Sequence, residues 1–233
     1  GLGYIHKRNP SAKVEVKSAS EVVMPFSRVL KSIPFYGFTL NYMTRAACFY
    51  TLTGYVVLYF TSAGVNAGMA ALALSMFSLA SLCGRLLFGW IIDVYIDARK
   101  GLLVSNVVLC IGMIVVGVLG PTSTLFVILG PVIVGFGHGI GLLSLPLATS
   151  KFFGSKNFPL ANGIINSSSY LVGSYGPIFT GILAAATGGY TLPFVIIGLI
   201  GLVGGILSVI GKAPESDSPM SGPAAVHEVV TEP

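Results

Sequence analysis

The chain has 233 residues, of which 54% are hydrophobic and only 9% are charged, and its formal net charge at pH 7 is +5. A water-soluble domain carries about 25% charged residues to cover its surface, so this composition excludes an ordinary soluble protein. The mean hydropathy is +0.86, and apolar runs recur at about 20 residues, the length that crosses a bilayer as a helix. The sequence therefore predicts an all-α, multi-pass membrane protein.

Residues 1–33 precede the first apolar run and are predicted to form a basic cytosolic segment. Lys and Arg outnumber Glu in this segment, which contains no Asp. It lacks the apolar core and small-residue cleavage site of a signal peptide. Because the chain opens on Gly-Leu-Gly-Tyr-Ile rather than on Met, we expect a fragment that begins partway through a longer protein.

Six membrane spans are predicted within residues 34–211, followed by a disordered cytosolic tail at 212–233. Lys and Arg in the connections after the second and fourth spans fall on the same side as the basic N-terminal segment, whereas the other three connections contain neither residue. The positive-inside rule then places both ends of the chain in the cytosol. The predicted spans are 34–62, 67–92, 101–120, 123–149, 159–187 and 190–211.

Two basic residues lie inside predicted spans, Arg45 in the first and Arg85 in the second, whereas no Asp or Glu lies deep in any span. An arginine at such depth costs about 3 kcal/mol or more, so intramembrane charges usually face a cavity, a partner or a substrate. Three explanations for Arg45 and Arg85 remain open. An anionic substrate balances their charge, carboxylates in a missing part of the protein balance it, or the side chains snorkel to the membrane surface. Asn41 and Tyr42 lie at helical spacing from Arg45 and predict one polar, cavity-lining side of this span.

Glycine-rich runs in the fourth and sixth spans are typical either of close helix packing or of a bending site. His138 lies in the first of these runs, where it either carries protons or only bonds a neighbouring helix. In the fifth span Asn166, Ser169 and Tyr170 belong to a polar patch that either lines a pathway or joins helices. His138 and these three residues are further candidates for the lining of a cavity.

No enzyme constellation is present. An intramembrane pair of aspartates, a His-Glu-x-x-His motif and a phosphate-binding loop are all absent from the sequence. We therefore expect no catalytic residues, no metal site, no cofactor and no nucleic-acid partner.

Two stretches carry a resemblance to a known family. Gly84-Arg85-x-x-x-Gly89-Trp90-x-x-Asp93, followed by Arg99-Lys100, resembles the second-helix signature in the C-terminal half of a major facilitator superfamily transporter. The resemblance is closest to the monocarboxylate transporter and oxalate/formate antiporter branch. The stretch between that branch's tenth and eleventh helices is similar to Phe153-Gly154-Ser155-Lys156-Asn157, then Ala161-Asn162-Gly163 and Gly176-Pro177 with Gly181.

The resemblance implies that the six spans are helices seven to twelve of a twelve-helix transporter, with residues 1–33 as the loop between its halves. Such a protein moves a small organic anion, here a monocarboxylate, across the plasma membrane by rocker-switch alternating access, as a symporter or antiporter coupled to a proton or a counter-anion. The missing N-terminal half and the lipid bilayer would be its partners. A transporter-like sensor or accessory subunit that does not transport is the alternative, and an unrecognised membrane enzyme is a third hypothesis.

The resemblance also implies roles for individual residues. Arg85 occupies the position that is associated with binding the substrate carboxylate. Arg45 is a second candidate contact on the ground of its own position within a span and not of the resemblance. The cytosolic gate would comprise Gly84, Gly89, Asp93 and Arg99. The chain departs from the family at Ser81, where monocarboxylate transporters often carry an aspartate, and at residues 167–170, where oxalate transporters carry a lysine.

Overall fold

The computed structural model describes residues 25–94 and 97–210, without the side chains of residues 90–94. All of these residues belong to one compact unit, Met24–Glu215. Most of the predicted basic segment and the whole predicted tail lie outside the described residues. At the end of that basic segment, Phe26–Lys31 forms a short helix, α1.

The described part of the chain consists of helices and short connections, without a strand, which confirms the predicted all-α class. α2 has a proline at its second position, where the missing N–H is not needed for helix bonding. α5 begins after Ser123, whose hydroxyl accepts a hydrogen bond from the amide of Leu125. After α1 the elements are α2 (Ile33–Ser62), α3 (Ala67–Val94), α4 (Ala98–Ile114), the π-helix η1 (Val115–Leu119), the 3-10 helix η2 (Gly120–Thr122), α5 (Thr124–Gly173), α6 (Tyr175–Thr187) and α7 (Thr191–Val209).

The 50-residue helix α5 is broken at Gly154, which has a φ of 75° and a ψ of 163°. A positive φ of this kind is accessible to glycine and strained for other residues. The sequence predicted a loop over residues 150–158 between two spans, and the structure shortens this loop to a break at Gly154, because the chain is helical on both sides of it. Gly154 is the residue of α5 that leaves helical geometry. We call residues 124–153 the first limb and residues 155–173 the second limb of α5.

The second limb of α5 and α6 run on from each other with an interruption at Ser174. Pro177 follows three residues later and has no N–H to bond the carbonyl of Gly173, so the helical ladder opens at this point. The predicted span 159–187 is therefore two helical pieces. α6 ends at Gly188, which adopts the left-handed conformation with a φ of 72°.

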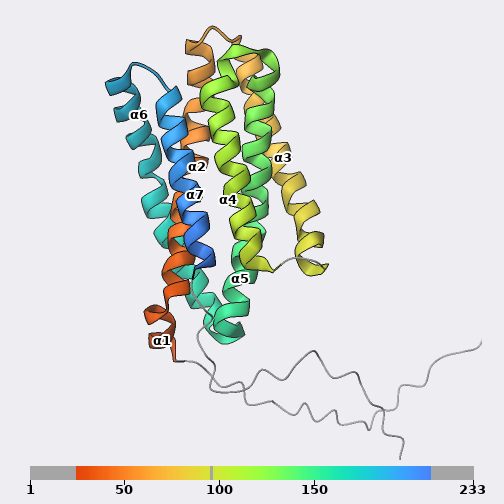
Figure 1. Cartoon of the computed structure of the whole chain (residues 1–233), viewed down its shortest axis with the longest axis vertical. Helices are drawn as coiled ribbons and strands as arrows, with labels where there is room; N and C mark the ends of the chain where they lie inside the picture. The colour runs from red at the N-terminus through yellow and green to blue at the C-terminus, as the bar shows by residue number, and fades with distance from the viewer. Residues whose placement is uncertain (1–24, 95–96, 211–233) are drawn as a thin grey trace, which may run out of the picture. The chain divides into compact units, whose positions relative to one another are not determined.

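Figure 1 shows the long helical segments lying side by side. They alternate in direction along the chain when the two limbs of α5 are taken separately. Four helical stretches of the described residues are long and apolar enough to cross a membrane. One of these stretches has 64 residues, which is enough for two crossings at about 20 residues each, and it contains the predicted fourth and fifth spans. The predicted first span, in α2, is not among the four, and it stays a prediction. The four stretches are Ala67–Gly89, Ala98–Thr122, Thr124–Thr187 and Thr191–Val209.

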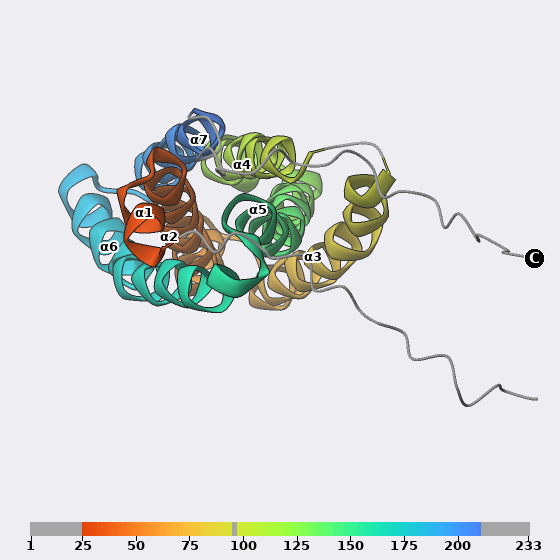
Figure 2. The same cartoon turned by 90° about the horizontal axis from the view of Figure 1, so that it is seen from below.

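The first limb of α5 packs closely between α3 and α4 (Figure 2). A Cβ on Gly139 would collide with the carbonyl oxygen of Ser81 on α3. On the other face of the limb, a Cβ on Gly137 would lie 2.8 Å from the amide nitrogen of Leu109 on α4. These glycines let three backbones approach each other, which supports the packing interpretation of the glycine-rich run.

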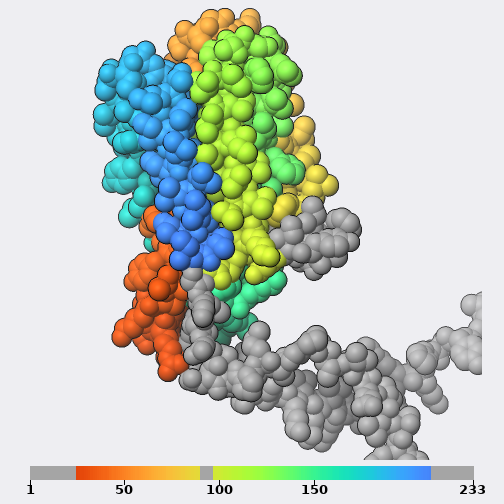
Figure 3. Space-filling model, viewed as in Figure 1, coloured from red at the N-terminus to blue at the C-terminus, as the bar shows by residue number. Residues whose placement is uncertain are grey.

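α4 and α7 cover one face of the unit (Figure 3). Large apolar side chains on this face are exposed, including Ile111 on α4 and Val203 on α7. The opposite sides of the same helices are buried. An apolar outer surface of this kind is what a helix bundle presents to lipid rather than to water.

The buried side chains form two apolar clusters at different heights of the bundle. The first cluster includes Leu52 and Phe60 of α2 and Val134 of α5. The second includes Phe38 of α2 and Leu145 of α5. Between the two clusters lies a level of the bundle where several buried side chains are polar.

Candidate functional site

A polar layer separates the two apolar clusters in each of four neighbouring helices. On α2 the segment between the clusters holds Arg45, and on the first limb of α5 it holds His138. The corresponding segments of α3 and α4 hold Arg85 and Ser105. The layer thus brings both predicted arginines to the middle of the bundle, the level at which alternating-access transporters hold substrate.

Arg45 lies inside the protein, with 2% of its surface exposed. Its Nη1 donates a hydrogen bond of 3.0 Å to the carbonyl oxygen of His138, and its guanidinium carbon lies 4.3 Å from the centroid of the Tyr42 ring. A Cβ on Gly141 would lie 2.9 Å from Arg45 Cδ, so the glycine leaves room for the side chain. Arg45 Nε is buried without a hydrogen-bond partner in the described part of the chain. One N–H donor of the guanidinium group is therefore unused.

His138 is held by aromatic rings. Its imidazole stacks on Phe49, with ring centroids 4.6 Å apart and planes inclined by 16°, and it lies 5.9 Å from the Phe77 ring. Its Nδ1 is buried and unpaired among residues 25–94 and 97–210. A buried polar atom without a partner destabilises a protein by about 1–3 kcal/mol. The fixed ring therefore offers an open bonding position inside the polar layer.

Arg85 and Tyr170 complete the layer and are exposed, in contrast to Arg45 and His138. Arg85 interacts electrostatically with His138, and Tyr170 interacts electrostatically with Arg45. The backbones of α3 and α5 touch at this level, since a Cβ on Gly139 would lie 3.0 Å from the amide nitrogen of Arg85. These contacts and charge interactions link residues of α2, α3 and both limbs of α5, and this set of Tyr42, Arg45, Arg85, His138 and Tyr170 is called the arginine site below.

The arginine site has no acidic neighbour in its own layer. Asp93 and Asp97 are the only acidic residues between positions 25 and 210. Asp93 follows Arg85 by eight residues on α3, a rise of about 12 Å along the helix axis. Two guanidinium groups therefore share this level of the described chain without a carboxylate to balance them.

The other predicted cavity-lining residues lie apart from the arginine site or bond within their own helix. Asn41 is fully buried, and its Nδ2 lies 3.4 Å from the carbonyl oxygen of Gly204 on α7. Asn166 Nδ2 donates to the carbonyl oxygen of Asn162, and Ser169 Oγ donates to that of Asn166. Asn41 thus contacts α7, and these bonds of Asn166 and Ser169 do not join two helices.

The two glycines of the predicted gate lie where α3 meets α5. A Cβ on Gly84 would lie 2.5 Å from the carbonyl oxygen of Phe136, and a Cβ on Gly89 would lie 2.9 Å from Leu143 Cδ2. Gly84 therefore requires the smallest residue, because its neighbour is backbone, whereas at Gly89 the flexible Leu143 side chain could move aside. The side chain of Asp93 lies outside the described residues, so its predicted role in the gate stays a prediction.

Arg99, the remaining residue of the predicted gate, binds the end of another helix. Its Nη2 donates a hydrogen bond of 2.7 Å to the carbonyl oxygen of Val209, and its Nε lies 3.4 Å from that of Ser208, both at the C-terminus of α7. Its guanidinium carbon lies 4.6 Å from the centroid of the Phe152 ring on α5. A cation at this place satisfies free carbonyls and complements the helix dipole.

The sequence analysis did not assign three residues to these sites. Phe77 packs beside His138, Gly141 accommodates Arg45, and Phe152 lies under Arg99. Only Gly141 had a signal, because it lies three residues after His138 and so on the same helix face. Among the described residues, no group of three His, Cys, Asp or Glu side chains is placed to hold a metal ion.

Comparisons with known proteins agree with this architecture. The family model of the Major Facilitator Superfamily matches residues 6–231. Over 169 residues, the chain is 30% identical to monocarboxylate transporter 12 from Xenopus laevis, an alignment that covers 68% of this chain and 35% of that relative. The chain thus spans about a third of the length of the curated relative it matches. The chain belongs to the major facilitator superfamily of membrane transporters, and within it resembles the monocarboxylate transporter branch.

Proposed function

We propose that the complete protein is a secondary active transporter that moves a small organic anion, a monocarboxylate, across the plasma membrane by rocker-switch alternating access. The described helices would be the C-terminal six of twelve, with residues 1–33 as the loop between the halves and both ends of this chain in the cytosol. The substrate would bind between this six-helix half and an N-terminal half. A proton or a counter-anion would be the coupling ion.

The observation that carries this proposal is the unbalanced positive charge of the polar layer. Arg45 is 2% exposed and one of its donors is unpaired, and Arg85 lies at the same level. Isolated charges in an apolar environment are unfavourable unless an opposite charge compensates them. A bound carboxylate supplies that charge, and a guanidinium can hold it through two parallel hydrogen bonds.

The two arginines would have different roles toward the anion. Arg85 is exposed and is the group that an entering carboxylate meets first. Arg45 is buried and already bonded to the His138 carbonyl, so it would contribute long-range attraction first and a direct contact only after a local rearrangement. Tyr170 is exposed and interacts electrostatically with Arg45, so it would be a further contact for the anion.

Uptake by the complete protein, reconstituted in liposomes, tests this function. Radiolabelled short monocarboxylates should accumulate with saturable kinetics, and their uncharged amides should not. The sensor alternative predicts binding without accumulation. Residues 1–233 alone, purified as a monomer, should not accumulate substrate, because only one side of the proposed site is present.

A further inference from the structure

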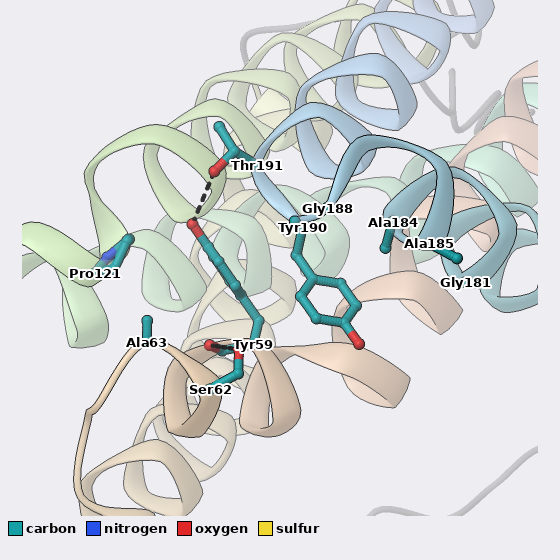
Figure 4. A pocket seen from close by; sticks show the side chains of 11 residues that line it. Tyr59, Ser62, Ala63, Pro121, Gly181, Ala184, Ala185, Gly188, Tyr190 and Thr191 are labelled. Atoms are coloured by element: carbon teal, nitrogen blue, oxygen red, sulfur yellow. Dashed lines mark hydrogen bonds between the residues drawn. The ribbon is translucent and has the colours of Figure 1, made fainter.

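A cavity of about 580 Å³ lies at the ends of α2, α6 and α7. This volume falls within the range of small-molecule sites, about 300–1,000 Å³. The cavity is separate from the arginine site, because Tyr59 in its lining follows Arg45 by 14 residues on α2, a rise of about 21 Å. Figure 4 shows the lining residues, which are Tyr59, Ser62, Ala63, Pro121, Gly181, Ala184, Ala185, Gly188, Gly189, Tyr190 and Thr191.

The lining is uncharged but contains hydroxyl groups. None of its residues is Lys, Arg, His, Asp or Glu, so an ionic ligand would find no opposite charge there. The Tyr59 hydroxyl donates to the carbonyl oxygen of Gly117 at 2.7 Å and lies 3.3 Å from Thr191 Oγ1. The Tyr190 hydroxyl makes no hydrogen bond within the described part of the chain, and it is available to a ligand.

The shape of the cavity favours a flat ligand. Ala184, Ala185 and Gly188, at the end of α6, form a floor without long side chains, and the Tyr190 ring extends between this floor and Tyr59 (Figure 4). Gly181 lies against the Tyr55 side chain, since a Cβ there would lie 2.7 Å from the Tyr55 hydroxyl. The Tyr190 ring is itself packed against Tyr55 and Tyr59, with ring centroids 5.6 Å and 5.8 Å apart. An aromatic wall facing a smooth floor fits a rigid ring system better than a flexible chain.

The surroundings of the cavity favour a lipid over a water-soluble ligand. Next to the floor on α6, Ile182 is 67% exposed, and next to Thr191 on α7, Leu192 is 46% exposed. Both helices belong to stretches that are apolar enough to cross a membrane. Tyrosines at the ends of such helices lie at the boundary between lipid and water, where a lipid hydroxyl group also lies.

We propose that this cavity binds a sterol, an uncharged lipid with a rigid ring system and a single hydroxyl group. The ring system would lie on the α6 floor against the Tyr190 ring. The sterol hydroxyl would bond the Tyr190 hydroxyl. Diacylglycerol shares the uncharged body and the single hydroxyl but is flexible, so it serves as the competing source of the same chemistry.

Photolabelling of the complete protein in lipid nanodiscs tests the proposal, with a photoreactive cholesterol analogue as probe and unlabelled cholesterol as competitor. The first variant is Ala185→Leu, which fills the cavity from an exposed position. Its matched control is Ala186→Leu, which adds the same volume at the exposed neighbouring residue outside the lining. Tyr190→Phe removes only the hydroxyl group.

Wild-type labelling should saturate, and excess cholesterol should suppress it. Ala185→Leu should lower labelling about tenfold or more, because a filled cavity excludes the ring system, and Ala186→Leu should stay within about twofold of wild type. Tyr190→Phe should lower labelling about fivefold, the effect of one hydrogen bond. Equal labelling of Ala185→Leu and wild type would overturn the proposal, as would labelling that cholesterol does not suppress. A photoreactive diacylglycerol that labels the site as efficiently as the sterol probe would overturn the sterol assignment.

Discussion

Arg45 on α2 and Arg85 on α3 lie at the same level of the bundle, near the same histidine, but in opposite surroundings. Arg45 is buried, bonded to the His138 carbonyl and packed on Tyr42, whereas Arg85 is exposed. The difference shows that one charge is built into the packing of α2 against α5, while the other is free to meet a ligand. Transport should therefore depend on both arginines, and the stability of the fold should not depend on Arg85.

The largest effect is expected for Arg85→Gln in the complete protein. Losing a charged contact to the substrate should lower monocarboxylate uptake about a hundredfold at equal surface expression. Arg85→Lys should lower uptake less, by about tenfold, because the charge remains and the bidentate fork is lost. Wild-type uptake by both variants across a panel of short carboxylates would remove Arg85 from the site.

Arg45→Met separates the electrostatic role of Arg45 from its structural role. An unpaired buried charge is unfavourable in an apolar environment, and removing it should offset the loss of the hydrogen bond to the His138 carbonyl, so the melting temperature should not fall. Uptake should still decrease about tenfold or more. The measurements are thermal unfolding of the purified complete protein and uptake in liposomes. A large drop in melting temperature would mean that Arg45 is mainly a structural tie between α2 and α5.

Gly139→Ala tests whether close packing of α3 on α5 holds Arg85 beside His138. The added Cβ collides with the Ser81 carbonyl oxygen, so we expect a loss of about 1–3 kcal/mol in stability. Gly163→Ala, in the second limb of α5, is the control, because no atom lies within 4 Å of a Cβ there. Thermal unfolding compares the two variants, and an equal effect in both would indicate a helix-propensity effect without a packing contribution.

Arg99→Gln should have the smallest effect, since Arg99 lies away from the arginine site and binds the C-terminus of α7. If this contact is made in one transport state only, its loss shifts the balance between states. Turnover should then change by a few-fold, with substrate affinity within about twofold of wild type. Lys100→Gln removes the adjacent exposed charge and is the control. Identical turnover in both variants and wild type would leave Arg99 with a structural role alone.

The sequence predicted the helical class and most helix positions, because apolar runs and Gly or Pro interruptions are local signals. It also singled out Arg45, Arg85 and His138, since charged and polar residues are rare inside apolar runs. It did not predict the hydrogen bond from Arg45 to the backbone carbonyl of His138, because that contact depends on how α2 packs against α5. For the same reason the contact of Asn41 with α7 was missed.

Ligand-induced stabilisation tests the central claim most directly, with propionate and its uncharged amide, propionamide, as a matched pair. The account predicts that propionate raises the melting temperature of the complete wild-type protein. At a propionate concentration of a hundred times the dissociation constant, binding should add about 2.7 kcal/mol to the free energy of unfolding. Propionamide should have no effect, and Arg85→Gln and Arg45→Met should each reduce the response to propionate. Equal stabilisation by the carboxylate and the amide, or a full response in both variants, would contradict the claim that the two arginines form an anion site.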